Sequence, residues 1–520
     1  MLFQHFTNEQ ILPLVPSILL LISSVIFYTT DKHKISLALL LFASLGLAFF
    51  MAHLDPFLNL WDEQYHALVA KNMAQNPFKP TLYTNPILEY DYTNWAGNHI
   101  WLHKQPLFLW QMALSIKIFG VNEVAVRIPS MLLHAFTTFL IYRIGNISHS
   151  KAVAYYGALF FSVAYYPLEL VCGKYPTDHN DTAFLFYVTA SIWTWFEYQH
   201  TQKKYWLILL GIFSGCAVLV KWLVGLLVYA IWLISVSATE KKKVCNTKFL
   251  IPFFSSLFIT CIVFFPWQFF IFMQYPAEAK HEFSLNTQHF FTAVEGHTGN
   301  IWFHFDALKK MYGSGDLVPF ILLVGIILYV KKASSKLYRI ATISSIIVVY
   351  VFYSLAATKM TAFCLIVSPF VFLGLGSLFL TFISRLKKII TPIPLQKIAE
   401  IILLLSICYF LFDLNRTVNY HTQQKPHDNF GRENDLREME LIHKLPALLG
   451  HKKTVLFNVN TSVNGHISVM FYTPYIAYSM MPNKEQIEKI KQQNYHIAVI
   501  NTGQIPSFLL QDEEITKINP

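Results

Sequence analysis

The sequence has few charged residues. Only 13% of its 520 residues are Asp, Glu, Lys or Arg, whereas 54% are hydrophobic. A soluble globular chain carries about 25% charged residues, so this composition excludes an ordinary soluble domain. Apolar runs of roughly 17–25 residues recur along most of the chain, which indicates an integral membrane protein.

Several signatures of redox, metal and nucleotide chemistry are also missing. The six cysteines form no CxxC pair, so no disulfide framework is predicted. No HExxH motif or closed ligand spacing accompanies the polar residues of loop 272–315, which are His281, Glu282, His289, His297 and His304. We therefore predict no metal site in that loop. A Gly-rich phosphate loop and a Rossmann unit are lacking, so no nucleotide is expected. A divalent cation is the one cofactor that the sequence leaves open.

The recurring apolar runs predict a membrane all-α fold of about twelve transmembrane helices. The first, 11–29, lacks a basic leader and a small-residue cleavage site, so we interpret it as a retained helix. The other spans are expected near 36–53, 123–145, 152–170, 181–198, 205–220, 223–238, 248–271, 316–330, 338–356, 361–383 and 397–413.

Basic residues predict the orientation of these spans. Alternate short loops are basic, namely 31–34, 202–204, 241–243, 331–336 and 385–388. Such loops are typical of the cytoplasmic side, which explains the net charge of +10 without invoking nucleic acid. We therefore expect a multi-pass protein of the cell inner (plasma) membrane. The periplasmic or outer side would then hold both termini, 54–122, 171–181, 272–315 and everything after 414.

The long outer loop 54–122 is predicted to contain two helices. Residues 64–75 have a helical pattern, and Pro106 is a suitable first residue for a helix over 106–119. The second is apolar but short for a span, so we interpret it as an amphipathic helix lying in the membrane interface. A thirteenth span here would place the downstream basic loops outside, and we reject it for that reason.

The composition changes after residue 414. Segments 454–459, 469–478 and 496–501 are predicted strands, and 483–494 is a predicted polar helix. We therefore divide the chain into a transmembrane domain, 1–413, with outer loops 54–122 and 272–315, and a small periplasmic α/β domain, 414–520.

Candidate catalytic residues lie in the outer loops. Asp62 and Glu63 are adjacent at the exit of a span, and a second outer turn brings Asp178 and Asp181 to the same side. Carboxylates there could deprotonate an acceptor or coordinate a divalent cation. The alternative is a solvated pair at a helix end. Since neighbouring residues point in different directions, we expect one acid of the pair to face the site and the other to brace the loop.

Cations are predicted on the same side. His103 and Lys104 precede the interfacial helix, and Arg127, Lys174 and Lys359 lie near the starts or ends of spans. Each alone could simply extend to the interface. Together, near acids, they suit an anionic headgroup, because a phosphate needs charge-assisted donors. Lys221 lies within an apolar run, and we interpret it as part of a turn between two spans rather than a functional group.

Motifs around these residues resemble those of a known protein family. The ordered set WDEQYHALVAKNM, LHKQPLFLWQMALSIKIFGVNEVAVRIPS, PTDHNDTAF, LVKWLVGLL, FFPWQFF and GHTGNIW covers most of 45–385. It resembles the GT-C glycosyltransferases of the aminoarabinose transferase and protein O-mannosyltransferase type. The resemblance implies a polyprenyl-phosphate-linked sugar donor, many spans, a periplasmic active site and an Asp-Glu pair in the first outer loop.

By position, the resemblance implies a general base or acceptor-orienting role for Asp62, with Glu63 as its partner and Asp178 as the acid of the second outer loop. It implies that Lys104 binds the lipid phosphate, and we add Arg127 and Lys359 as further donor-phosphate residues. We expect Tyr65, His103, Asp181 and His297 to line the substrate pocket. Three positions depart from the family: His103 replaces Glu, Gln105 replaces Pro, and Tyr65 replaces an Arg.

The hypothesis is therefore a hexosyl or pentosyl transferase that uses a polyprenyl-phosphate sugar. Lipid A, a protein and an envelope glycan all stay open as acceptors, and the sugar is not determined. A multi-span lipid or solute transporter or flippase is the alternative. It predicts acids near the bilayer midplane and paired repeats, whereas the candidate acids lie in outer loops and no repeat is found. A family member that binds without catalysis is disfavoured by the presence of all four residues Asp62, Glu63, Asp178 and Lys104.

Overall fold

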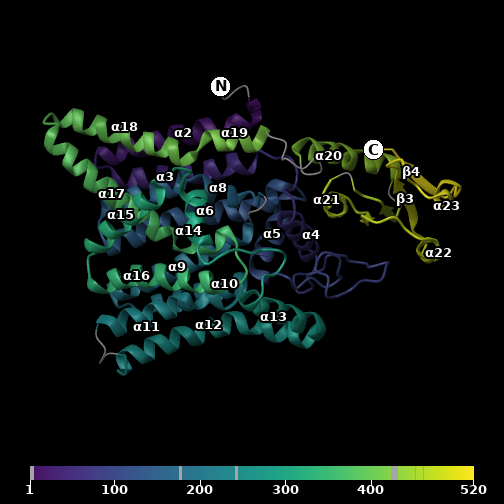
Figure 1. Ribbon diagram of the computed structural model, residues 1–520, viewed down its shortest axis with the longest axis horizontal. Helices are drawn as coiled ribbons and strands as arrows, with labels where there is room; N and C mark the ends of the chain where they lie inside the picture. Colours follow the sequence, from purple (N-terminus) through teal and green to yellow (C-terminus); the bar gives the residue numbers. More distant parts are fainter. Residues whose placement is uncertain are drawn as a thin grey trace. The chain divides into compact units, whose positions relative to one another are not determined.

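The computed structural model describes residues 5–174, 178–239, 244–422, 431–450, 452–460 and 462–519. The predicted basic loop 241–243 lies outside these residues. Helices dominate the described chain, and a small parallel sheet lies near its end (Figure 1). The predicted class, a membrane all-α fold with a small α/β segment, is confirmed.

The chain divides into two compact units. Unit 1 comprises Met1–Ala52, Ser130–Cys172 and His179–Thr417, and unit 2 comprises His53–Pro129, Gly173–Asp178 and Val418–Pro520. Unit 2 therefore groups the first outer loop with the C-terminal segment. The predicted domain boundary between 413 and 414 stays a prediction.

Unit 1 is built from helices. Neighbours along the chain pack side by side, for example α2 and α3 (Figure 1). Their bounds are α2 Asn8–Thr29, α3 His33–Ala52, α6 Glu123–Ser148 (which begins in unit 2), α7 Lys151–Val163, α8 Tyr165–Val171, α9 His179–Thr201, α10 Tyr205–Lys221, η1 Trp222–Leu226, α11 Leu227–Thr239, α12 Thr247–Gln274, α13 Pro276–Phe291, α14 Phe303–Tyr312, α15 Val318–Lys331, α16 Lys336–Leu355, η3 Thr361–Val367, α17 Ser368–Ile389, α18 Ile393–Phe412 and α19 Leu414–Thr422.

Eight helical segments of the described chain are long and apolar enough to cross a membrane. Predicted spans 205–220 and 223–238 form one of them, Tyr205–Thr239. Predicted spans 152–170, 181–198 and 316–330 do not meet this criterion. Span 152–170 is divided between α7 and α8 at Ala164, whose backbone is extended. Span 181–198 lies in α9, which is too polar, and span 316–330 corresponds to α15, which has only 14 residues. The total of about twelve spans stays a prediction.

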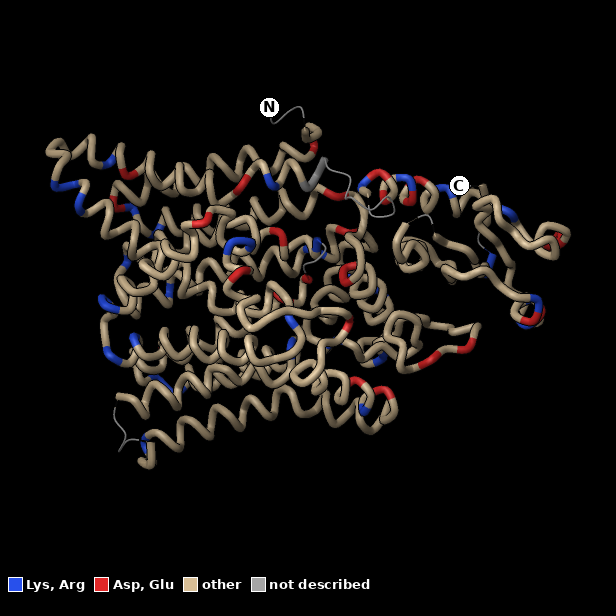
Figure 2. The backbone as a smooth tube through the Cα atoms, in the orientation of Figure 1, with Lys and Arg blue, Asp and Glu red and all other residues tan. Residues whose placement is uncertain are grey.

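Basic residues of unit 1 gather toward one end of its helices. Figure 2 shows Lys and Arg at the α15–α16 and α17–α18 turns, both at the left of the view, and few charges along the helix interiors. The grouping agrees with the charge pattern from which we predicted the cytoplasmic side.

Unit 2 combines helices with a four-stranded sheet. Its elements are α4 Asp62–Met73, α5 Pro106–Phe119, α20 Arg432–Leu449, β1 Thr454–Phe457, α21 Gly465–Tyr472, β2 Ile476–Ala477, α22 Lys484–Gln492, β3 His496–Ile500, α23 Ser507–Leu510 and β4 Ile515–Ile518. The strand order is β2-β1-β3-β4 and all pairs are parallel. The predicted helices of the first outer loop are confirmed as α4 and α5.

One predicted strand of the C-terminal segment is wrong. Residues 454–459 and 496–501 contain β1 and β3, and 483–494 contains α22, as predicted. Residues 469–478 are instead the end of α21 followed by the two-residue strand β2. A continuous apolar run does not distinguish a buried strand from a buried helix, and here every residue from Gly465 to Phe471 is buried.

The C-terminal segment packs on the first outer loop. Ile87 and Leu88 of that loop join Val455, Val499 and other sheet residues in one apolar core. On α4, Gln64 Nε2 donates to Val463 O at 3.2 Å and to Ser468 Oγ at 3.1 Å. The outer loop and the C-terminal segment are therefore one packed structure.

Lys71 of α4 fixes the end of α21. Its ammonium donates to the carbonyls of Met470, Phe471 and Thr473 at 2.7, 2.8 and 3.0 Å. A Lys at a helix C-terminus satisfies carbonyls that lack partners within the helix and interacts favourably with the helix dipole. Burial lowers the pKa of Lys71 to about 8, so the charged form that makes these bonds prevails at neutral pH.

We expect Lys71→Met to loosen the C-terminal segment, because it removes all three hydrogen bonds while keeping the length of the side chain. Hydrogen bonds to a charged group contribute about 1.5–3 kcal/mol, so protease cleavage within 431–519 should become roughly 10- to 150-fold faster. Limited proteolysis followed by mass spectrometry measures this. Lys117→Met, at an exposed position on α5, is the matched control, and equal cleavage of the two variants would contradict the assignment.

Candidate active site

The site begins at the first turn of α4. Trp61, which precedes the helix, has a φ of 63°. This backbone region is strained for a bulky residue and costs about 1–3 kcal/mol, so the surroundings must hold it in place. Trp61 N–H donates to Gln64 Oε1 at 3.2 Å, which closes the first turn. The turn presents Asp62 and Glu63 in different directions.

Glu63 points into the protein and forms a buried ion pair with Arg127. Arg127 Nε donates to Glu63 Oε1 at 2.7 Å and Nη2 donates to Oε2 at 2.9 Å. The same guanidinium donates to the carbonyls of Asp55 and Phe57 at 2.8 and 2.6 Å. Both side chains have no exposed surface. Glu63 is therefore the bracing acid, not a solvated helix end, and Arg127 is engaged by protein groups rather than placed to bind a donor phosphate.

A second buried charge group adjoins the first. Asp55 forms ion pairs with Arg432 and with Lys174, the latter at 3.3 Å. Arg432 Nη2 also donates to Leu54 O at 3.0 Å. Since Arg432 begins α20, these contacts tie the C-terminal segment to the residues that precede α4.

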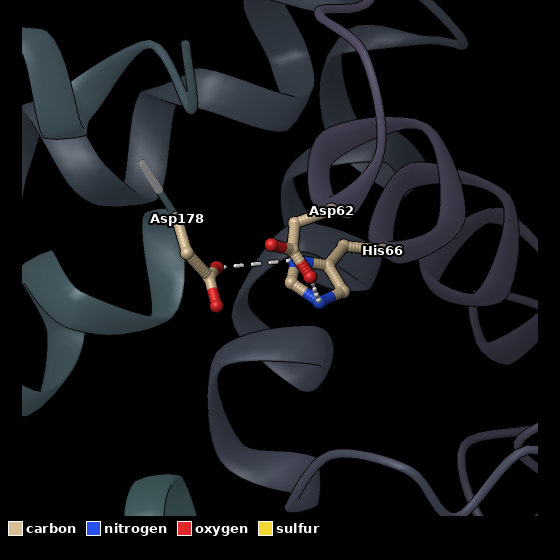
Figure 3. A group of neighbouring side chains, drawn as sticks. All are labelled: Asp62, His66 and Asp178. Carbon is tan, nitrogen blue, oxygen red and sulfur yellow. Dashed lines mark ion pairs between the residues drawn. The ribbon is translucent and has the colours of Figure 1, made fainter. Parts of the chain in front are cut away.

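Asp62 faces the opposite way and belongs to a cluster of four charged or titratable groups. Figure 3 shows each ring nitrogen of His66 paired with one of the two acids: His66 Nε2 lies 3.8 Å from Asp62 Oδ1, and Nδ1 lies 3.4 Å from Asp178 Oδ1. Lys104 Nζ lies 3.4 Å from Asp62 Oδ1 and 3.4 Å from Asp178 Oδ2. The structure thus brings together three predicted site residues, Asp62, Asp178 and Lys104.

Exposure separates the roles within this cluster. The side chains of His66 and Asp178 are 0% and 3% exposed, whereas those of Asp62 and Lys104 are 28% and 20% exposed. A substrate can therefore reach Asp62 and Lys104. His66 and Asp178 lie behind them and hold them in place.

His66 is the residue of this cluster that the sequence analysis missed. It follows Asp62 by four positions on α4, and residues four apart lie on the same face of a helix. That spacing was the available signal. The ring of His66 is also packed against Phe108 and Trp101, with centroid distances of 4.8 and 5.8 Å.

The donor set of the cluster fits a divalent cation in type. One ligand atom each from Asp62, His66 and Asp178 lie within 4.8 Å of one another, and carboxylate and imidazole are common ligands of divalent metals. These three residues would hold the ion, which would supply positive charge to a bound anion. Lys104 already places a positive charge against both carboxylates.

Two predicted pocket residues lie next to the cluster. Tyr65 is 1% exposed and its hydroxyl donates to Asn464 Oδ1 at 3.4 Å. Burial raises the pKa of Tyr65, so its hydroxyl keeps the proton that it donates. His103 is half-buried and stacks on Trp95, with a centroid distance of 4.6 Å and an interplanar angle of 10°.

Three other predicted residues lie in unit 1 and have local partners. Lys359 is 5% exposed, and its ammonium donates to carbonyls at the end of α16, including those of Tyr353 and Ser354 at 2.9 and 2.7 Å. Asp181 forms an ion pair with Lys221, which ends α10 at the predicted turn. The carbonyl of His297 accepts a hydrogen bond from the backbone N–H of Lys359 at 3.0 Å. Lys359 is thus a helix cap rather than an open phosphate ligand.

Comparison with known proteins agrees with the predicted resemblance. Residues 103–270 match the family model of the dolichyl-phosphate-mannose-protein mannosyltransferases. An uncharacterized protein of Aquifex aeolicus is 32% identical over 164 residues, which is 31% of this chain and 29% of that relative. This match spans less than a third of the relative's length.

Solved structures share the fold over most of the chain. ArnT from Cupriavidus metallidurans bound to undecaprenyl phosphate matches with a TM-score of 0.61 at 12% identity, covering 88% of each chain. The oligosaccharyltransferase AglB from Archaeoglobus fulgidus, in complex with an inhibitory peptide and a dolichol-phosphate, matches with a TM-score of 0.52 at 12% identity, covering 89% of this chain and 69% of that one. The chain therefore has the same overall fold as ArnT and AglB.

We expect Glu63→Gln to destabilise the protein strongly, because it leaves the Arg127 guanidinium buried without its counter-charge. Removing one partner of a buried pair costs about 3–5 kcal/mol. Thermal unfolding in detergent measures the loss. Asp62→Asn is the comparison, since the adjacent acid is partly exposed and should change the unfolding temperature far less. Equal unfolding temperatures for Glu63→Gln and the unmodified protein would refute the bracing role.

Proposed function

We propose that this chain, a multi-pass membrane protein with the GT-C fold, transfers a sugar from a polyprenyl-phosphate donor to an envelope acceptor. The observation that carries the proposal is the cluster of Asp62, His66, Lys104 and Asp178, in which an open carboxylate and an open ammonium lie 3.4 Å apart. One can take a proton while the other stabilises a departing phosphate. ArnT bound to undecaprenyl phosphate and AglB bound to dolichol-phosphate support a lipid-phosphate ligand.

The proposed reaction is a single displacement at the anomeric carbon of the sugar. The acceptor oxygen forms a bond to that carbon while the bond between the carbon and the phosphate oxygen breaks. The acceptor proton passes to the carboxylate of Asp62, which acts as the general base. The polyprenyl phosphate leaves with added negative charge, which the Lys104 ammonium stabilises where it develops.

Asp178 and His66 are proposed to position the two reacting side chains. Asp178 lies 3.4 Å from Lys104 Nζ and is nearly unexposed. The Lys104 ammonium lies 3.4 Å from an oxygen of each carboxylate, so Asp178 holds it beside Asp62. His66 fixes the carboxylate of Asp62 from within the same helix.

The proposal also covers the side of the membrane on which the active site lies and the kind of acceptor. The basic loops favour an active site on the periplasmic or outer side. Lipid A, a protein or a glycan would each offer the hydroxyl that the mechanism needs, and the donor sugar could be a hexose or a pentose. Mass spectrometry of envelope lipids and proteins from a deletion strain would identify both partners through the loss of one defined sugar.

Asp62→Asn tests the proposed base. An amide does not accept the proton, and a general base contributes about 100- to 10,000-fold, so kcat should fall by that factor while the binding of donor lipid is retained. Transfer from a radiolabelled polyprenyl-phosphate sugar measures the rate. Glu89→Gln, which removes an exposed acid of the same loop, should transfer at the normal rate. Unchanged turnover in Asp62→Asn would exclude Asp62 as the base.

Lys104→Ala tests the proposed phosphate ligand. Loss of charge-assisted hydrogen bonds worth about 1.5–3 kcal/mol corresponds to roughly 10- to 150-fold weaker binding of undecaprenyl phosphate. Binding to the protein in nanodiscs measures this directly. The control is Lys117→Ala, an exposed lysine on α5 of the same loop. If both variants bound the lipid equally well, the phosphate would have to be held elsewhere. Loss of binding in both would instead point to the charge of the loop as a whole.

A further inference from the structure

Trp95 joins the active-site cluster to the C-terminal segment. One neighbour is His103, which stacks on it at 4.6 Å and precedes Lys104 in the chain. The other is Tyr65, whose ring meets Trp95 edge-on at 4.9 Å and whose hydroxyl reaches Asn464. Trp95 and His103 are both half-buried, so the stack retains exposed aromatic surface beside the cluster.

The C-terminal contribution comes from the carboxyl end of the sheet. In the sheet order β2-β1-β3-β4, the strand β2 lies on one side of β1, and β3 and β4 lie on the other. The direction in which the chain adds strands therefore reverses between β1 and β3. Open parallel sheets bind ligands at the carboxyl ends of the strands at this point. Asn464 lies in the loop that leaves β1 here, and its neighbour Val463 bonds to Gln64 on α4. This edge of the sheet therefore meets the first turn of α4.

Two polar groups at this edge have no partner among the described residues. Asn464 Nδ2 and His466 Nδ1 are buried atoms without a hydrogen bond. His466 is only 8% exposed, and a buried polar group without a partner costs free energy. The position of His466 therefore indicates that a ligand supplies the missing hydrogen bond to its Nδ1 atom. The Oδ1 atom of Asn464 already accepts a hydrogen bond from Tyr65, and its Nδ2 is left without a partner among the described residues.

The charges at this edge favour a neutral ligand over an anionic one. Burial lowers the pKa of His466 to about 4, so its ring is neutral at physiological pH. The carboxylate of Glu438 lies against Gly465 and bonds to Ser462, which places negative charge at the start of α21. A neutral ligand that offers hydroxyl groups fits both observations, whereas a phosphate would be repelled.

We propose that Trp95, His103, Asn464 and His466 form a subsite for a neutral sugar ring. The C–H face of a sugar packs on an aromatic stack, and its hydroxyls bond to the amide and the imidazole. The inference rests on the proposed function and deepens it, because it assigns the C-terminal segment a share of substrate recognition. The sugar can be the one carried by the donor or one belonging to the acceptor, and binding experiments distinguish these sources.

The test measures binding to the full-length protein in nanodiscs, with Asp62→Asn introduced throughout so that nothing is turned over. The probes are undecaprenyl phosphate, undecaprenyl phosphate mannose, and soluble methyl glycosides. Trp95→Ala should weaken sugar binding by about 2- to 10-fold, in line with the free energy of an aromatic contact. Trp95→Phe keeps an aromatic face and should largely restore it.

The three probes distinguish a donor sugar from an acceptor sugar. Weaker binding of undecaprenyl phosphate mannose, with undecaprenyl phosphate unchanged, places the donor sugar in the subsite. Weaker binding of methyl glycosides, with both lipids unchanged, places the acceptor sugar there. Asn464→Asp, which keeps the acceptor for Tyr65 and removes the amide donor, should weaken the same probe as Trp95→Ala.

The control is Trp110→Ala, which removes another tryptophan of the same outer loop, bonded to Pro77 O at 2.8 Å. If Trp95→Ala and Asn464→Asp bind every probe as Trp110→Ala does, with normal thermal unfolding, the subsite is refuted. Turnover is not measured here, so this failure is distinct from failure of the proposed transferase reaction.

Discussion

The buried ion pair between Glu63 and Arg127 is the interaction on which the site depends. Taking two charges out of water is costly unless the geometry is good and the remaining donors are satisfied. Here the guanidinium donates to both oxygens of the carboxylate and to the backbone carbonyls of Asp55 and Phe57. These bonds connect residues 55–63 to the start of α6. They also hold the strained backbone of Trp61, and thereby set the direction of Asp62.

Two adjacent acids thus serve opposite purposes. Successive residues of an α-helix are rotated by about 100°, so the pair cannot face the same surroundings. Glu63 has no exposed surface and is neutralised by an arginine, whereas Asp62 is 28% exposed and faces a lysine. The rigid neighbour gives the open carboxylate a fixed position, and preorganised charges are what an active site needs.

Much of the site could be predicted from the sequence, and the exceptions have a common cause. Asp62 and Asp178 are recognisable because each follows an apolar run on the predicted outer side, and Lys104 because it directly precedes the apolar helix 106–119 on that side. Arg127 and Lys359 were assigned to phosphate because their residue type and side fit, but the sequence does not reveal that protein carbonyls and Glu63 already occupy them. His66 was overlooked although its spacing from Asp62 was visible. The contacts of Gln64, Tyr65 and Lys71 with the C-terminal segment join residues about 400 positions apart, a separation at which local patterns carry no information.

The sharing of α4 between the cluster and the C-terminal segment has a consequence for biosynthesis. Gln64 and its partner Val463 are separated by 399 positions. At about 5–20 residues per second, roughly 20 to 80 s pass between the synthesis of α4 and that of the segment that packs on it. During this interval the outer loop lacks the contacts made by Gln64, Tyr65 and Lys71. The cluster of Asp62, His66, Lys104 and Asp178 therefore lacks part of its framework in the nascent protein, and that framework can be completed only after translation has passed α21.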